Sequence, residues 1–243
     1  MSKHELLNNI DHKDLRVVTK LSKELGDSHW YAPTFWREFR SVQAHYPILF
    51  QKNTEGGFLP LAFFGFQKDE NLFLTSNGWD ASYIPLSVKR MPFFVGFQSV
   101  NDDGKVIEQR VITIDTESPK ITTTEEGQPL FLEYGGNSEY LDSMANILET
   151  LHQGVQENHE FIEALEENDL LEPVTINVKL NNGSNNQMIG FHTINEEKLN
   201  QLPNEKIVEL HQKGYLQAMY CAVISQVKFN ELANKKNALV ERL

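Results

Sequence analysis

The stretch from residue 137 to 172 carries the longest helical pattern in the chain. Apolar residues recur there at spacings of three and four, with Asn158 in the one polar position: Leu141, Met144, Leu148, Leu151, Val155, Ile162 and Leu165. This spacing places them on one face of an α-helix. Two structures fit such a seam, a helix laid on a sheet and a coiled coil that forms a homodimer through 141–165, and we favour the first. Gly154 weakens the middle of this helix by about 1 kcal/mol relative to Ala, and Pro173 is expected to end it.

The region before this helix, residues 41–135, is expected to be mainly β-structure. Short runs rich in β-branched and aromatic residues alternate with turn sequences such as Asn77-Gly78 and 101–104. The expected strands lie within 42–50, 58–66, 71–75, 93–100 and 105–115. Short strands joined by tight turns favour antiparallel pairing. The polar stretch 118–129 is expected to be a loop.

The remaining segments complete an α+β fold. Residues 174–192 alternate apolar and polar positions around an Asn-rich turn, which predicts a hairpin. Helices are expected at 204–213 and 216–234, a C-terminal helical pair within 204–236. We therefore predict an antiparallel sheet of roughly seven to nine short strands, with the long helix and the helical pair packed on it. Residues 41–243 would form one domain, and residues 1–40 an extension with a short aromatic helix around Trp36 and Phe39.

The charge balance narrows the range of partners. The 243 residues hold 22 Lys and Arg against 34 Asp and Glu, which gives a net charge of −12. This excess argues against nucleic acid and against an anionic membrane surface as partners. Membrane insertion is not expected either, because no stretch approaches 18 consecutive apolar residues. The one cysteine, Cys221, allows no intramolecular disulfide. With neither an apolar leader nor a spanning segment expected, a cytoplasmic protein is predicted, and secretion without a signal also fits this sequence.

Two short strings concentrate aromatic and charged residues, at 45–47 and 77–94. One interpretation is a ligand-binding pocket with aromatic walls and polar anchors, made of His45, Tyr46, Trp79, Asp80, Tyr83, Arg90 and Phe93. The other is structural, with the rings in the core and an Asp80–Arg90 ion pair joining two turns. Both interpretations remain open from the sequence.

An enzyme is the alternative to a binding protein. In it His45 would act as a base, Asp80 would orient it, and Arg90 would hold an anion, provided that the three lie within hydrogen-bond reach. The sequence contains no phosphate-binding glycine loop, no dinucleotide fingerprint, no C-x-x-C pair and no nucleophile elbow. We therefore predict neither a cofactor nor a metal site, and favour a non-enzymatic binding role.

Several strings resemble the bacterial SapC family. They are His45-Tyr46-Pro47-Ile48-Leu49-Phe50, Gly78-Trp79-Asp80-Ala81-Ser82-Tyr83-Ile84-Pro85, Arg90-Met91-Pro92-Phe93, and Gly190-Phe191-His192-Thr193-Ile194-Asn195. The resemblance extends over about residues 40–235 and is distinct from the membrane-spanning permease of the same name. The family is named after a surface-layer gene region, and its members often neighbour genes for tryptophan-halogenase-like flavoproteins and TonB-dependent receptors.

The resemblance implies an accessory protein of nutrient uptake or of a modification pathway, which binds a small ligand or a protein partner. It transfers no catalytic residue, because the family has no agreed ones. A surface-layer or assembly protein is a further alternative that the family name raises.

Overall fold

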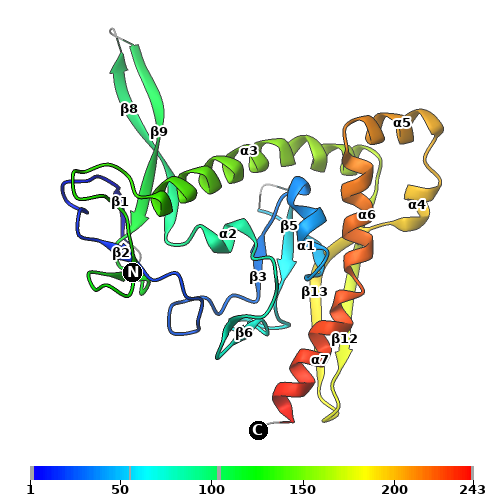
Figure 1. Ribbon diagram of the computed structural model, residues 1–243. Coiled ribbons are helices and arrows are strands. Elements are labelled where there is room, and N and C mark those ends of the chain that lie inside the picture. The colour runs from blue at the N-terminus through cyan, green and yellow to red at the C-terminus, as the bar shows by residue number, and fades with distance from the viewer. Residues whose placement is uncertain (1–2, 55, 103–104, 242–243) are drawn as a thin grey trace. The chain divides into compact units, whose positions relative to one another are not determined.

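The computed structural model describes residues 3–54, 56–102 and 105–241 (Figure 1). It confirms the α+β class, with antiparallel strands, one long helix and a C-terminal helical pair. The chain packs into two compact units, each made of two separate stretches. Unit 1 comprises Met1–Asp27 and Val88–Gln153, and unit 2 comprises Ser28–Ser87 and Gly154–Leu243. The domain boundary near residue 40 stays a prediction.

Unit 1 contains two three-stranded antiparallel sheets. The strand order of the first sheet is β1 (His4–Leu6), β9 (Lys105–Asp115), β8 (Phe93–Asp102). The strand order of the second sheet is β10 (Ile121–Thr122), β2 (Arg16–Val17), β11 (Gln128–Pro129). The long β8–β9 ladder confirms the strands expected at 93–100 and 105–115, whereas positions 103 and 104 of the turn between them lie outside the described residues. The stretch 118–129, predicted as a loop, contributes β10 and β11, because two-residue strands carry no periodicity that a sequence could reveal.

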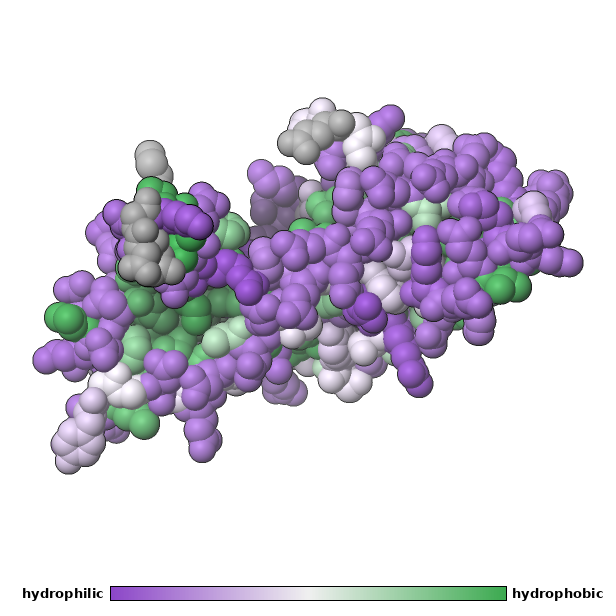
Figure 2. Space-filling model, turned by 90° about the horizontal axis from the view of Figure 1, so that it is seen from above, coloured by the Kyte–Doolittle hydropathy of each residue, from purple (hydrophilic) through white to green (hydrophobic). Residues whose placement is uncertain are grey.

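Unit 2 is built on a five-stranded antiparallel sheet and a small hairpin. The sheet order is β12 (Leu171–Lys179), β13 (Asn185–Ile194), β4 (Ile48–Lys52), β5 (Phe58–Phe63), β3 (Tyr31–Pro33), and the hairpin pairs β6 (Leu74–Thr75) with β7 (Gly78–Trp79). Phe50 of β4 and Phe63 of β5 are fully buried. On the face of the whole chain seen in Figure 2, hydrophilic residues predominate.

Strand pairing differs from the prediction in one respect. The strands of the described residues are divided over four sheets, where we expected one sheet system. The reason is long-range pairing: β9 pairs with β1 near the N-terminus, and β4 pairs with β13 from the second half of the chain. Local patterns show which segments are extended but not which distant segments they meet.

The helices follow the predicted order with altered ends. They are η1 (Trp36–Glu38), α1 (Phe39–Val42), α2 (Leu86–Lys89), α3 (Glu139–Glu167), α4 (Glu196–Asn200), α5 (Asn204–Gln212), α6 (Tyr215–Ser225) and α7 (Lys228–Val240). The last predicted helix, 216–234, is thus two helices. None of the helices within the described residues is long and apolar enough to cross a membrane.

The long helix α3 ends before the proline that was expected to stop it. Asp169 adopts a left-handed backbone conformation with φ 50°, and β12 begins at Leu171, so Pro173 lies inside a strand. Because β12 is an edge strand, a residue without an N–H is tolerated there. Most of the predicted seam, including Leu141, Leu148, Ile162 and Leu165, is buried within the chain, whereas Val155 is exposed. A homodimer through 141–165 stays a prediction.

Candidate functional site

Three of the predicted pocket residues meet in a hydrogen-bonded cluster in unit 2. Tyr46 is fully buried at the start of the sheet. Its hydroxyl accepts a hydrogen bond from Trp79 Nε1 at 2.7 Å and donates one to the backbone carbonyl of Tyr83. Burial raises the pKa of Tyr46 well above its ordinary value, so its hydroxyl keeps its proton. These contacts fix the segment around residues 79–83 to the end of α1 and the start of β4.

A buried carboxylate, Glu38, holds the other end of this segment. It accepts hydrogen bonds from Thr34 Oγ1 at 2.6 Å, from Tyr83 Oη at 2.7 Å and from the Leu86 backbone N–H at 2.7 Å. Burial raises the pKa of Glu38, and these three donors partly offset that rise. The sequence analysis missed Glu38. A signal existed in principle, since an acidic residue stands there between Trp36 and Phe39 in an aromatic run.

The remaining predicted residues have separate partners. Asp80 forms an ion pair with Lys235 of α7, and the His45 Nε2 lies 2.8 Å from the Ser82 hydroxyl. In unit 1, Arg90 donates a hydrogen bond to the Phe93 carbonyl at 2.6 Å and stacks on the ring of its neighbour Phe94, while Phe93 itself is fully buried. Asp80 and Arg90 therefore each have a partner of their own. Their role in ligand binding stays a prediction.

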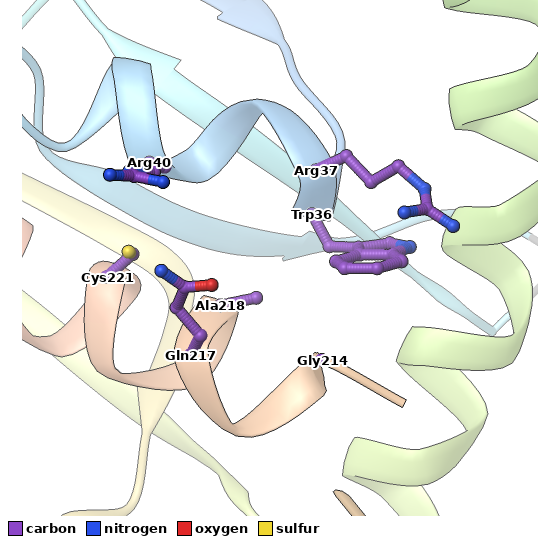
Figure 3. Close-up of a pocket in the computed structure, with 7 residues that line it drawn as sticks. All are labelled: Trp36, Arg37, Arg40, Gly214, Gln217, Ala218 and Cys221. Atoms are coloured by element: carbon purple, nitrogen blue, oxygen red, sulfur yellow. The ribbon is translucent and has the colours of Figure 1, made fainter. Parts of the chain in front are cut away.

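A groove that the sequence analysis missed lies between η1 and α1 on one side and α6 on the other (Figure 3). Its volume is about 210 Å³, which suits a group of a few atoms rather than a large ligand. The lining residues are Trp36 and Arg37 of η1, Arg40 of α1, Gly214 before α6, and Gln217, Ala218 and Cys221 of α6. We call it the arginine groove.

The two arginines of the groove differ in their surroundings. Arg37 forms an ion pair with Glu157 and stacks on the Trp36 ring at 4.3 Å from its centroid. The hydrogen bond to Glu157 raises the pKa of Arg37. Arg40 is exposed, and no residue of the described chain forms a hydrogen bond or an ion pair with its guanidinium. Figure 3 shows Arg40 on one side of the groove and Gln217 and Cys221, both of α6, on the other. This arrangement offers an unused guanidinium and an amide to a guest with acceptor oxygens.

The aromatic wall of the groove is held in place from several sides. Trp36 packs edge-to-face against Tyr215, with ring centroids 5.2 Å apart, and its backbone N–H donates to Asn158 Oδ1 at 3.1 Å. Gly214 has φ +80°, and an added Cβ would come within 3.4 Å of the Trp36 ring. Glycine is favoured there for its left-handed backbone conformation.

Neither catalysis nor metal binding is indicated by the groove chemistry. Burial raises the pKa of the Cys221 thiol, although Arg40 partly offsets this, so the thiol is protonated at neutral pH and a weak nucleophile. Nowhere in residues 3–54, 56–102 and 105–241 do three or more His, Cys, Asp or Glu side chains gather as a metal ion would need.

The structure is that of an α+β protein with a small groove lined by two arginines. The model of the SapC family matches residues 7–232, and the chain therefore belongs to the SapC family. This confirms the resemblance seen in the sequence. Searches of curated proteins and of solved structures found no match.

Proposed function

We propose that this protein binds, in its arginine groove, an anionic group, a carboxylate or a phosphate, of a small ligand or a partner. The observation that carries this proposal is the Arg40 guanidinium, which lines the groove without a partner among the described residues. An accessory role in nutrient uptake or a modification pathway, suggested by the family resemblance, is part of the proposal.

Arginine suits this task because its planar donors match the two oxygens of a carboxylate or phosphate. Arg37 is fixed by Glu157 and by the Trp36 ring, so it contributes positive charge with little loss of side-chain entropy. The Gln217 amide can donate a further hydrogen bond from the opposite wall. The net charge of −12 opposes the approach of an anion at long range. Binding should therefore depend on these short contacts.

The test is a calorimetric titration of the whole chain with inorganic phosphate and, separately, with succinate. Arg40→Gln should weaken binding at least tenfold, because a hydrogen bond to a charged group contributes about 1.5–3 kcal/mol. Gln217→Leu should weaken it less. The matched control is Lys179→Gln, which removes one exposed cation of β12 that does not line the groove. Equal affinity of the Arg40→Gln variant and the wild-type protein for both anions would refute the proposal.

A further inference from the structure

A serine and a histidine meet on the surface of unit 2, outside the arginine groove. The Ser82 hydroxyl oxygen lies 2.8 Å from His45 Nε2. Ser82 is exposed in the segment after β7, and His45 is partly exposed after α1. A hydroxyl within hydrogen-bond distance of an imidazole is the basic geometry of an activated serine nucleophile. The sequence analysis named His45 as a base but paired it with Asp80 and Arg90.

The backbone that carries Ser82 is held on both sides of it. On one side, Trp79 Nε1 donates to Tyr46 Oη at 2.7 Å, and Asp80 pairs with Lys235. On the other, the Tyr83 carbonyl accepts from Tyr46 and the Tyr83 hydroxyl donates to the buried Glu38. An exposed serine on so well anchored a segment is preorganised, which a reacting side chain requires.

The surroundings of His45 favour the neutral imidazole. Its backbone N–H donates to the Val42 carbonyl at 3.0 Å, which fixes the residue to the end of α1. Burial and the nearby ammonium of Lys228 lower the pKa of His45, and Glu231, which pairs with Lys228 at 2.6 Å, acts in the opposite direction. The net effect is a lowered pKa, so at neutral pH the ring can accept a proton at Nε2.

Two backbone donors beside the hydroxyl are also available. Within the described part of the chain, neither the Ser82 N–H nor the Tyr83 N–H donates a hydrogen bond to another residue. Serine hydrolases use the N–H of the residue after the nucleophile to stabilise the oxyanion of the tetrahedral intermediate.

We propose that Ser82 and His45 form a nucleophile–base pair that takes an acyl group from an ester. The Ser82 oxygen attacks the ester carbonyl while its proton passes to His45 Nε2. The carbonyl carbon–alkoxide bond then breaks, and the imidazolium returns that proton to the leaving alcohol. Water, deprotonated by the same imidazole, cleaves the acyl-serine, so the carboxylic acid is released and both side chains are restored. This inference does not rest on the arginine groove.

The experiment treats the whole chain with a fluorophosphonate probe, which phosphonylates activated serines with loss of fluoride. Intact-mass and peptide mass spectrometry should find the adduct on Ser82 in the wild-type protein. Ser82→Ala should abolish it, and His45→Gln should slow labelling about 100-fold, the scale of general-base assistance. Ser76→Ala is the matched control, because Ser76 is exposed in the β6–β7 turn and has no histidine partner in the described residues.

The pH dependence gives a second readout that a structural serine would not show. Labelling should increase with pH through a midpoint below 6.5, the ordinary pKa of histidine, because only the neutral ring accepts the proton. Hydrolysis of p-nitrophenyl acetate should fall in parallel in the Ser82→Ala and His45→Gln variants, whose melting temperatures should match that of the wild-type protein. Absence of an adduct on Ser82, or equal labelling rates in the wild-type protein and the His45→Gln variant, would overturn the proposal.

Discussion

Replacing Tyr46 by phenylalanine tests whether the aromatic cluster is structural. The change removes one oxygen atom and leaves the ring, so no cavity of note is created in the core. It deletes two hydrogen bonds at once, the one from Trp79 Nε1 and the one to the Tyr83 carbonyl. The indole N–H and the carbonyl then lose their partner at a site where the neighbouring rings of Phe64 and Phe73 are buried.

The expected loss follows from these two bonds. A net hydrogen bond contributes about 1 kcal/mol, and a polar group left without a partner in a buried place costs about 1–3 kcal/mol. Tyr46→Phe should therefore lower the free energy of unfolding by about 2–4 kcal/mol. The same chemical change at Tyr134, which is 95% exposed, should lie within about 0.5 kcal/mol of the wild-type value.

Urea denaturation followed by tryptophan fluorescence measures this difference. The midpoint of the Tyr46→Phe variant should shift while the m-value stays constant, because the surface exposed on unfolding is nearly unchanged. A loss below about 0.5 kcal/mol, or one equal to that of Tyr134→Phe, would refute the argument. The predicted ligand role of Tyr46 would then gain weight, since the hydroxyl would be free of a structural duty.

Three further changes probe other parts of the fold. Burial raises the pKa of Glu38 in the folded state above its ordinary value of 4.5, so the wild-type protein should lose stability as the pH rises from 4.5 through the folded-state pKa, by about 1.36 kcal/mol per unit of difference between the two pKa values. Glu38→Gln should remove this pH-dependent loss, as measured by urea denaturation from pH 4 to 8. Identical pH profiles of the variant and the wild-type protein would contradict the argument. Gly154→Ala would place a Cβ 2.5 Å from the Phe35 ring, so the thermal midpoint should fall although alanine favours helices, and a rise would contradict this. Lys120→Met removes the ammonium that lies 2.8 Å from the Asp27 carboxylate in unit 1, where the two side chains are each 4% exposed, and should cost about 3–5 kcal/mol by denaturant titration. Adding Asp27→Asn should recover part of this loss, and no recovery would contradict the ion-pair explanation.

Local patterns in the sequence predicted the elements better than their ends. The three- and four-residue spacing between Leu141 and Leu165 correctly predicted α3, and alternation after residue 174 correctly predicted the β12–β13 hairpin. The predicted end of α3 at Pro173 was wrong, because Asp169 takes a left-handed conformation and the chain then enters an edge strand that tolerates Pro173. Similarly, Gly154 looked like a weak point of the helix, whereas the structure shows that it makes room for Phe35.

The candidate sites were only partly visible in the sequence. The sequence analysis placed Tyr46, Trp79 and Tyr83 together in one predicted pocket. In the structure, Trp79 Nε1 donates to the Tyr46 hydroxyl, which donates to the Tyr83 backbone carbonyl, and the Tyr83 hydroxyl donates to Glu38. The arginine groove went unnoticed, since Arg40 and Gln217 are 177 positions apart and neither belongs to a known motif.

The sequence by itself determined the class of fold, the long helix and the acidic character, because each follows from local periodicity or from composition. It also indicated the family, through the resemblance of several strings to SapC proteins. Only the tertiary structure decided how the strands of the described residues divide over four sheets, that Arg40 has no partner among those residues, and that Ser82 contacts His45. The physical reason is that the pairing of strands and the meeting of distant side chains depend on which segments come together as the apolar faces become buried. A pattern with a period of two or 3.6 residues reports which face is buried but does not identify its partner.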